Sequence, residues 1–485
     1  MRNRRSSRQG ARFSPGPLIL LVVLGLSLVA LAYVAVRMLL AGRPAITVSA
    51  PFEVVGRNST LLVDVQDKHG LKAARVTVRQ GDQDHVVLDR TYTPPRPSDQ
   101  LRWQPAQEKA FKLQEGPGKV TVWARNDSWG DFLRGRVATL EKDFTVRLVP
   151  PRVEVQTTQH YVSQGGCDTV VYKVTPAGVA SGVQVGEHFF RGFPVPGASD
   201  PALHFAIFCL PYDAKPGTPV RVSARDEADN QSLVGFWLKV FPKAFRTRDL
   251  PLDDTFMNKV VPEIMSQTPS LTDQGDLLKN YLQINRDLRK ANNGELARLA
   301  ASSHQGFLWS EPFQQLGNSQ VEAQFADTRR YIYNGQAVDQ QTHLGFDLAT
   351  TAHAPVTAAN DGTVVMAEFF GIYGNAVVID HGYGLMSLYG HLSTFDVKKG
   401  ESVKRGQTIA HSGATGLAAG DHLHFSMLYQ DVQVDPREWW DAHWIHDRLA
   451  VKLAQFGSGT GPGRMVKAEA TPGAGPGAAS PAAPR

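Results

Sequence analysis

The N-terminal segment places the strongest constraint on how this chain can fold. Residues 18–36 form a run of 19 residues without a charge, close to the roughly 20 residues that cross a bilayer as a helix. Five arginines and no acidic residue precede this run. A cleaved signal peptide is the alternative, but its apolar core is usually shorter and ends at a small-x-small site. We therefore expect a basic cytoplasmic tail over residues 1–17 and an uncleaved transmembrane anchor over residues 18–40, with the remainder of the chain outside the cytoplasm.

Length and composition predict several folded domains. A single hydrophobic core seldom organises more than about 300 residues, whereas this chain has 485, of which 42% are hydrophobic and 20% are charged. The formal net charge of +5 is small for this length and comes partly from the N-terminal arginines, so we expect no nucleic-acid partner. Glycine, alanine and proline dominate the C-terminal end, and we predict a disordered tail over residues 449–485.

The chain has two cysteines, Cys167 and Cys209, and both lie in the part that we expect to be exported. An oxidising compartment favours a disulfide between them, and two buried free thiols are the alternative. Neither cysteine is close in sequence to the histidine motifs described below, so we expect no cysteine among the metal ligands.

Two related β-rich units follow the anchor, over residues 45–148 and 149–243. Each contains an alternating run, "TLLVDVQD" in the first and "TVVYKVTP" in the second, and each closes with a V-x-V-x-A-R strand that enters a polar turn. Short alternating runs separated by turn residues are typical of antiparallel sandwiches, and about 100 residues is the size of an immunoglobulin-like unit. We expect two immunoglobulin-like β-sandwich units without a catalytic site, which act as a stalk or bind an envelope protein. Their histidines are scattered, and we expect none of them to be a ligand: His69, His85, His160, His188 and His204.

The period of the apolar residues changes over residues 244–318, which we interpret as a helical connector. The stretch "GDLLKNYLQINRDLRK" predicts a helix because one face carries its apolar residues, namely Leu277, Tyr281, Ile284 and Leu288. Ser270 and Asp273 resemble the capping pattern at a helix start. We expect a second short helix over residues 294–301. Strands punctuated by glycine return over residues 319–448, so the fold class is mainly β and multidomain.

Histidines are dense in this last β region. "HLGFD" sets His343 and Asp347 four residues apart, and "GDHLHFSMLY" carries His422 and His424 one residue apart on a strand. Side chains alternate along a strand, so both histidines leave on the polar face while the alternate apolar residues enter a core. Two imidazoles and one carboxylate suit a catalytic zinc ion, with either His422 or His424 as the third ligand.

These motifs resemble a known family when they are taken together. H-x-x-x-D, then "YGHLS" at residues 389–393, then H-x-H resemble the lysostaphin/LytM-type zinc endopeptidases that cut peptidoglycan cross-bridges. The resemblance covers roughly residues 325–440. It implies the duplicated hybrid motif, an antiparallel β fold with a groove.

The resemblance also implies a role for each site residue. One Zn²⁺ per peptidase domain would be held by His343, Asp347 and His424, while His391 and His422 would stand beside it as the catalytic histidines. The sequence leaves open which of these two is the general base. The chain departs from many relatives at Ser426, where they carry an acid that would contact a histidine. We expect no role in the site for His353 and His411, and a structural hydrogen bond for His381.

The function implied is that of a zinc metalloendopeptidase, a hydrolase of peptidoglycan peptide cross-links that remodels the cell wall. By analogy with periplasmic enzymes we expect a single-pass inner-membrane protein with its bulk in the periplasm, acting on the D-alanyl-diaminopimelate bond. The alternative is a non-catalytic LytM-type activator of a cell-wall amidase, but such members usually lack a zinc ligand. A structural envelope protein with a vestigial peptidase is a third class. The segment upstream of His343 is a candidate for covering the groove.

Overall fold

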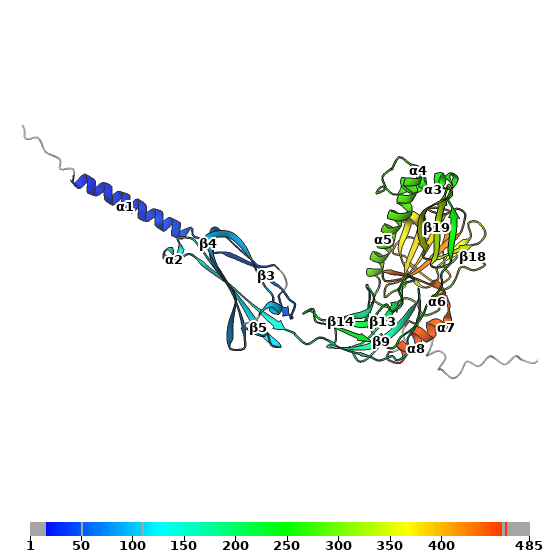
Figure 1. Cartoon of the computed structure of the whole chain (residues 1–485), viewed down its shortest axis with the longest axis horizontal. Helices are drawn as coiled ribbons and strands as arrows, with labels where there is room; N and C mark the ends of the chain where they lie inside the picture. Colours follow the sequence, from blue (N-terminus) through cyan, green and yellow to red (C-terminus); the bar gives the residue numbers. More distant parts are fainter. Residues whose placement is uncertain (1–15, 50–51, 109–110, 458–460, 463–485) are drawn as a thin grey trace, which may run out of the picture. The chain divides into compact units, whose positions relative to one another are not determined.

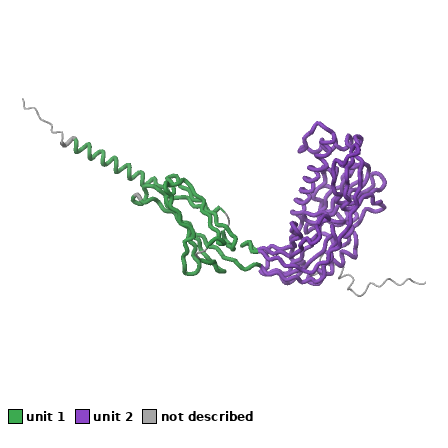
Figure 2. The backbone as a smooth tube through the Cα atoms, in the orientation of Figure 1, with its two compact units in different colours: residues 1–150, 226–230 green, residues 151–225, 231–485 purple. Residues whose placement is uncertain are grey.

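The computed structural model describes residues 16–49, 52–108, 111–457 and 461–462, and it is mainly β. The predictions made above for the arginine-rich tail and for residues 463–485 concern residues that lie outside the described part of the chain. The chain divides into two compact units, the first formed by residues 1–150 with 226–230 and the second by residues 151–225 with 231–485 (Figure 2).

An apolar helix opens the first unit. Helix α1 spans Gly16–Leu39, and its only charged residue is Arg37, in the last turn. Residues Ile19–Leu39 are long and apolar enough to cross a bilayer, and none of this stretch is buried inside the protein. The described part of the chain therefore offers this helix no protein core, and a bilayer is the environment that its composition fits.

The first unit contains one six-stranded sheet, in the order β1-β3-β5-β6-β2 with β4 paired to β3. Burial alternates along β3, where Leu61, Val63 and Val65 are buried and the residues between them are not, because one face of the sheet covers the core. The strands are β1 (Ala45–Val48), β2 (Val54–Val55), β3 (Leu61–Gln80), β4 (Gln83–Trp103), β5 (Gly116–Asn126) and β6 (Val137–Val146). Two short helices, η1 (Pro105–Gln107) and α2 (Gly130–Leu133), complete this unit.

The second unit begins with two four-stranded sheets that share a core. The orders are β12-β13-β9-β7 and β11-β10-β14-β15. A disulfide joins Cys167 to Cys209, which lie opposite each other on β9 and β13. The strands are β7 (Arg152–Val155), β9 (Cys167–Thr175), β10 (Ala180–Val185), β11 (His188–Arg191), β12 (Phe193–Pro194), β13 (Leu203–Cys209), β14 (Val220–Arg225) and β15 (Gln231–Gly235). Two short strands, β8 (Tyr161–Ser163) and β16 (Lys239–Phe241), pair in parallel beside them.

Helices follow, and they differ in detail from the sequence prediction. The predicted helix begins at Leu277, and its N-cap is Asp276, whose side chain accepts from the Lys279 N–H. Asp273 instead accepts from Asn280 Nδ2 and from the Gly275 N–H. The helix continues without interruption as α4 (Leu277–Gln283), the π-helical turn η2 (Ile284–Leu288) and α5 (Arg289–Ala301). Helix α3 (Asp254–Gln267) precedes it and was not predicted.

An eight-stranded sheet forms the centre of the C-terminal region, in the order β18-β21-β29-β25-β24-β23-β27 with β30 paired to β29. Val377 and Ile379 face the core shared with the two four-stranded sheets, whereas Ala376 and Val378 face the core beneath α3, α4 and α5. Burial on both faces explains why these strands read as nearly continuous apolar runs. The strands are β18 (Gln320–Ala323), β21 (Phe346–Ala349), β23 (Gly362–Phe369), β24 (Asn375–Asp380), β25 (Leu385–Leu392), β27 (Ser402–Val403), β29 (Leu423–Tyr429) and β30 (Val432–Val434).

Two three-stranded sheets flank this central sheet. Their orders are β17-β19-β20 and β22-β28-β26. The strands are β17 (Thr247–Pro251), β19 (Asp327–Tyr333), β20 (Gln336–His343), β22 (Pro355–Thr357), β26 (Thr394–Phe395) and β28 (Thr408–His411), and a 3-10 turn η3 covers Gly371–Tyr373. The segment that was a candidate for covering the groove is part of the sheets themselves, since it forms β18 of the central sheet and β19 and β20 of a three-stranded sheet.

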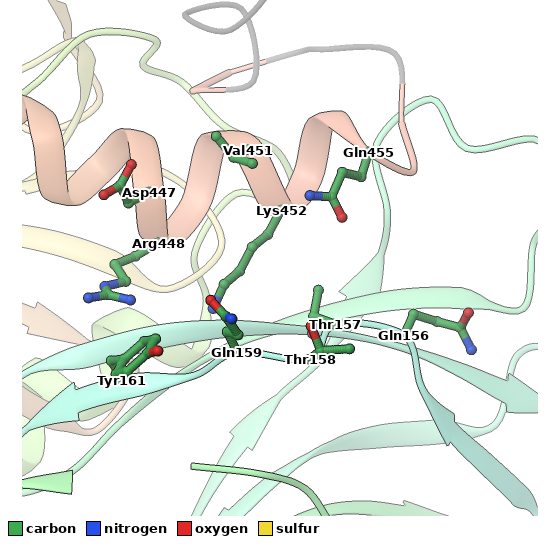
Figure 3. Close-up of a pocket in the computed structure, with 10 residues that line it drawn as sticks. All are labelled: Gln156, Thr157, Thr158, Gln159, Tyr161, Asp447, Arg448, Val451, Lys452 and Gln455. Carbon is green, nitrogen blue, oxygen red and sulfur yellow. The ribbon is translucent and has the colours of Figure 1, made fainter. Parts of the chain in front are cut away.

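The ordered chain extends beyond residue 448, where the sequence predicted a disordered tail. The last helices are α6 (Pro436–Trp440), α7 (Ala442–Ile445), η4 (His446–Ala450) and α8 (Val451–Ala454), and they bury Leu449 and Leu453. Lys452 reaches down from this helical segment toward the β7–β8 connection across a cleft with polar walls (Figure 3). Its Nζ lies 2.6 Å from Asp168 Oδ1 and 2.8 Å from the Thr169 carbonyl oxygen.

We expect the buried ion pair to be required for stability. In Lys452→Met the Asp168 carboxylate, which is fully buried, would lose its countercharge, and the free energy of unfolding should fall by about 3–5 kcal/mol. Thermal unfolding followed by circular dichroism measures this effect. Gln455→Ala, at an exposed position one turn later, is the matched control and should leave the melting temperature unchanged. A melting temperature of Lys452→Met equal to that of the wild type would contradict the prediction.

Candidate metal centre

The pairing of two central strands brings the candidate ligands together. His343 ends β20, and after a turn at Gly345 the next strand, β21, carries Asp347. Strand β29 pairs antiparallel with β21 so that His424 lies opposite Asp347. The turn requires glycine, because a Cβ at Gly345 would lie 2.5 Å from Ser426 Oγ and 2.6 Å from the Phe425 carbonyl oxygen.

Three acceptor atoms meet at one point. His343 Nε2 lies 2.9 Å from Asp347 Oδ1 and 3.0 Å from His424 Nδ1, and His424 Nδ1 lies 3.0 Å from the same carboxylate oxygen. One ligand atom from each residue lies within 4.8 Å of the others, and all three residues are buried. The sequence predicted these three residues as a set, with His422 as the alternative to His424.

Hydrogen bonds on the far side of each ring show why this arrangement needs a cation. His343 Nδ1 donates to the Gln324 carbonyl oxygen at 3.0 Å, and His424 Nε2 donates to Ser426 Oγ at 2.8 Å. The inward nitrogens therefore carry lone pairs, as does the carboxylate oxygen. Acceptors cannot hydrogen-bond to one another, whereas a bound metal ion would satisfy all three. Two imidazole nitrogens and one carboxylate are a donor set that suits zinc and leaves a coordination position open.

Burial keeps the candidate ligands in the protonation states that metal binding requires. It lowers the pKa of His343, and it lowers that of His424 to about 4, so both rings are neutral near pH 7. Burial acts in the opposite direction on Asp347, but its surroundings, in which three histidines converge on the carboxylate, hold its pKa well below 3.8.

Two further residues, Ser426 and Arg329, hold these ligands in place. Ser426 Oγ accepts from His424 and donates to the Leu344 carbonyl oxygen at 2.7 Å, so the serine supplies the contact that an acid would make at this position. Arg329 on β19 donates from Nη2 to Asp347 Oδ2 at 2.5 Å, which leaves Oδ1 to face the histidines. Arg329 is 14 residues from the nearest predicted ligand, and no local pattern marks it.

His391 and His422 lie beside the three ligands. Their ring centroids are 4.8 Å apart, and the His391 centroid is 5.8 Å from that of His424. His391 Nδ1 donates to the Thr415 carbonyl oxygen at 2.8 Å, and His422 Nδ1 donates to that of Gly420 at 2.9 Å. In each ring Nδ1 is therefore the nitrogen held by the backbone, and Nε2 is the nitrogen that can exchange a proton with a substrate.

The two rings differ in electrostatic environment. Burial lowers the pKa of His391 well below 6.5, with the neighbouring rings of His422 and His424 acting in the same direction. Burial also opposes the charging of His422, but Asp347 Oδ1 lies 3.6 Å from its Nε2 and raises its pKa. Such a pair can combine a proton acceptor with a proton donor.

Helix α3 braces the loop that orients both rings. Thr415 and Gly420, whose carbonyls hold His391 and His422, lie on the connection between β28 and β29. Lys259 Nζ donates to the carbonyl oxygens of Ala418 and Ala419 at 3.2 and 3.3 Å. Glu263, one turn later, accepts a hydrogen bond from the Gly416 N–H.

The remaining histidines of this region contact other groups. His381 is fully buried between the Asp361 carbonyl oxygen, 2.7 Å from Nδ1, and Ser387 Oγ, 2.8 Å from Nε2, which confirms its structural role. His353 contacts the Ser412 carbonyl oxygen and His411 contacts Thr394.

Comparison with known proteins identifies the family to which the region around the candidate ligands is similar. Residues 341–436 match the model of peptidase family M23. The chain contains an M23 peptidase domain. The LytM-type resemblance of the sequence is confirmed for this domain, and the matched residues include the three candidate ligands and both flanking histidines.

The similarity to two curated proteins extends over less than a quarter of this chain. Over 116 residues the chain is 40% identical to the peptidoglycan DD-endopeptidase ShyB of Vibrio cholerae, covering 24% of this chain and 26% of that protein. Over 107 residues it is 34% identical to the murein hydrolase activator EnvC of Escherichia coli, covering 22% and 26%. The chain thus spans about a quarter of the length of these relatives. A crystal structure of a putative M23 peptidase from Pseudomonas aeruginosa matches 58% of this chain and 95% of its own, with 22% identity and a TM-score of 0.36.

We predict that Arg329 contributes to metal affinity. Removal of a group that orients a ligand typically weakens metal binding about 10- to 100-fold. Arg329→Met should therefore release zinc to a competing chelator at lower chelator concentrations than the wild type, and the shift can be followed with a zinc-responsive dye.

The adjacent arginine provides a matched control for this measurement. Arg330 forms its ion pair with Asp249, at 2.6 Å, and not with a candidate ligand. Arg330→Met should retain the zinc affinity of the wild type. Equal affinities in the two variants would show that Arg329 does not position Asp347 for the metal.

Proposed function

We propose that this protein is a membrane-anchored zinc metalloendopeptidase that hydrolyses peptide cross-links of peptidoglycan. The observation that carries the proposal is the convergence of the acceptor atoms of His343, Asp347 and His424 beside two further histidines whose Nδ1 atoms are held by backbone carbonyls. The M23 domain and the DD-endopeptidase name of its relative in Vibrio cholerae support this reaction class.

The five residues divide into ligands and proton carriers. A zinc ion held by His343, Asp347 and His424 would supply a Lewis acid that polarises the scissile carbonyl and acidifies water. His391 and His422 lie close enough to act on one substrate bond, since their ring centroids are 4.8 Å apart. One ring takes the proton of the attacking water at its Nε2, and the other donates a hydrogen bond to the carbonyl oxygen as negative charge develops there.

The rest of the chain suggests where this chemistry takes place. Helix α1 would anchor the protein in the inner membrane with its basic tail in the cytoplasm and its bulk in the periplasm. We propose the D-alanyl-diaminopimelate cross-link as the bond cut, by analogy with the DD-endopeptidase relative. We further propose that the β-rich regions of residues 45–148 and 149–243 are immunoglobulin-like units that act as a stalk or bind an envelope protein.

A non-catalytic activator of an amidase is the second candidate, because the M23 region is also similar to EnvC, which is named a murein hydrolase activator. An activator does not need the complete set of ligands and flanking histidines. All five residues are present here and adopt one compact arrangement, which favours catalysis.

Digestion of purified peptidoglycan by the zinc-loaded full chain in detergent tests the proposal. Mass spectrometry should show cross-linked dimers converted to monomers by the wild type and by His411→Ala, a control that alters a histidine outside the site. His424→Ala should leave the dimers intact because it removes a ligand. If the wild type releases no monomer but stimulates an added amidase, the protein is an activator.

We also predict that α3 contributes to turnover through Lys259. Without its hydrogen bonds to Ala418 and Ala419, the loop that orients His391 and His422 gains freedom. Loss of about 0.7–1.4 kcal/mol of stabilisation corresponds to a roughly threefold to tenfold lower kcat for Lys259→Met. Zinc content should not change, since no ligand is touched.

Lys279→Met, at an exposed position on α4, is the matched control for this variant. It should retain the kcat of the wild type. If both variants retain wild-type turnover, the helical segment does not brace the catalytic histidines.

A further inference from the structure

An aromatic loop of the first unit lies against the outer part of helix α1. The loop follows β5 and contains the single turn α2, Gly130–Leu133 (Figure 1). The Trp129 ring packs edge-to-face on Tyr33 of α1, with ring centroids 5.9 Å apart. Arg37, one turn after Tyr33, places its guanidinium 5.3 Å from the Trp129 ring centroid. The loop therefore contacts the last turns of the proposed membrane anchor.

Polar contacts fix the end of α1 to the first sheet. Asn126 Nδ2 donates to the Gly42 carbonyl oxygen and to Asp67 Oδ2, both at 2.9 Å. The same side chain accepts from the Arg136 N–H at 2.7 Å through its Oδ1. The Asn126 side chain thus binds both the segment that follows α1, at Gly42, and the segment that follows the aromatic loop, at Arg136. Arg136 Nη2 also donates a hydrogen bond of 3.4 Å to the Met38 carbonyl oxygen.

The position of Tyr33 sets the depth of the loop in the bilayer. Tyr33 precedes the end of α1 by six residues, which is about 9 Å along a helix axis at 1.5 Å per residue. It belongs to the uncharged run of residues 18–36, and Arg37 is the first charge after that run. If α1 crosses the bilayer, Trp129 must lie at the level where hydrocarbon gives way to headgroups. Tryptophan and tyrosine concentrate at this level in membrane proteins.

Phe132, at the tip of the loop, is hardly covered by other described residues of the protein. It is 88% exposed, the highest value among the exposed large hydrophobic residues of the described chain. Asp131 and Phe132 both adopt the left-handed backbone region, with φ of 48° and 53°. This conformation is costly for residues other than glycine, and such strain tends to occur at functional positions. Here the strained turn coincides with the most exposed large apolar side chain of the described residues.

The charges around the tip fit a lipid headgroup layer. Arg37 and Arg136 flank the aromatic residues, and Arg136 Nη1 lies 3.6 Å from Asp131 Oδ1, which offsets the one acidic group on the turn. Arginine side chains at the bilayer surface attract anionic phospholipids. The loop thus combines an exposed aromatic side chain with cationic side chains at the depth of the lipid headgroups.

We propose that residues 129–134 insert into the headgroup and acyl boundary of the outer leaflet beside α1. Trp129 and Phe132 enter the boundary, and the arginines bind lipid phosphates. The partner is a phospholipid bilayer, and the loop gives the first unit a second point of attachment that holds its sheet at a defined angle to the membrane. This inference rests on α1 being a retained anchor in the proposed function.

Site-directed spin labelling of the full chain in vesicles of phosphatidylethanolamine and phosphatidylglycerol tests the insertion. A nitroxide is attached to Phe132→Cys, to Val86→Cys on strand β4 and to Val29→Cys within α1. Val86 and Val29 are both well exposed in the protein, at 52% and 68%. The measurement is the ratio of collision rates with oxygen, which enters lipid, and with a water-soluble nickel complex.

The expected result is an oxygen-to-nickel ratio at position 132 severalfold above that at position 86 and closer to that at position 29. If position 132 has the same ratio as position 86 while position 29 reports lipid, the loop does not insert but α1 is still a membrane anchor. An aqueous ratio at position 29 would overturn the anchor and the insertion together.

A second measurement leaves Phe132 intact. Lipids brominated near the headgroup end of their acyl chains should quench the tryptophan fluorescence of the wild type more than that of Trp129→Phe, because Trp129 is the residue at the boundary. Equal quenching of the two proteins would contradict the proposed depth of Trp129. Neither substitution touches the M23 domain, so peptidase activity in detergent should be unchanged.

Discussion

The pairing of β21 with β29 is the constraint on which the rest of the site depends. A shift of one residue would send His424 to the other face of the sheet, because side chains alternate along a strand. In the observed register His424 lies opposite Asp347. The same register places Phe425 and Met427 in the core shared with the four-stranded sheets. Burial of these apolar residues therefore also fixes the candidate ligands in place.

His391 and His422 depend on further contacts beyond this pairing. Their orientation comes from carbonyl groups on the loop between β28 and β29, and that loop is braced by α3. The helices pack on the face of the central sheet opposite the four-stranded sheets. The central sheet is therefore covered on both faces, and the helical segment supports the candidate site as well as connecting two regions of the chain.

The sequence predicted the parts of this arrangement that local patterns encode. The H-x-x-x-D and H-x-H motifs identified His343, Asp347 and the histidine pair, and the apolar spacing identified the helix beginning at Leu277. Arg329, Lys259 and α3 were missed because their roles arise from contacts between distant segments. The helix of residues 451–454 was missed because its apolar residues are few and it is stabilised by burial against the four-stranded sheets. The contact of Trp129 with Tyr33 likewise joins residues far apart in the chain.

The core beneath the central sheet determines whether the M23 segment can be regarded as a separate module. It joins Val171 and Phe208 of the four-stranded sheets to Phe425 of the M23 domain in one hydrophobic cluster. The match to the M23 family model ends at residue 436, yet the same cluster also includes Trp439, Leu449 and Leu453 of the helices that follow. The M23 segment is therefore not an interchangeable cassette, because cutting the chain at the limits of the family match would expose apolar side chains that the neighbouring sheets and helices cover.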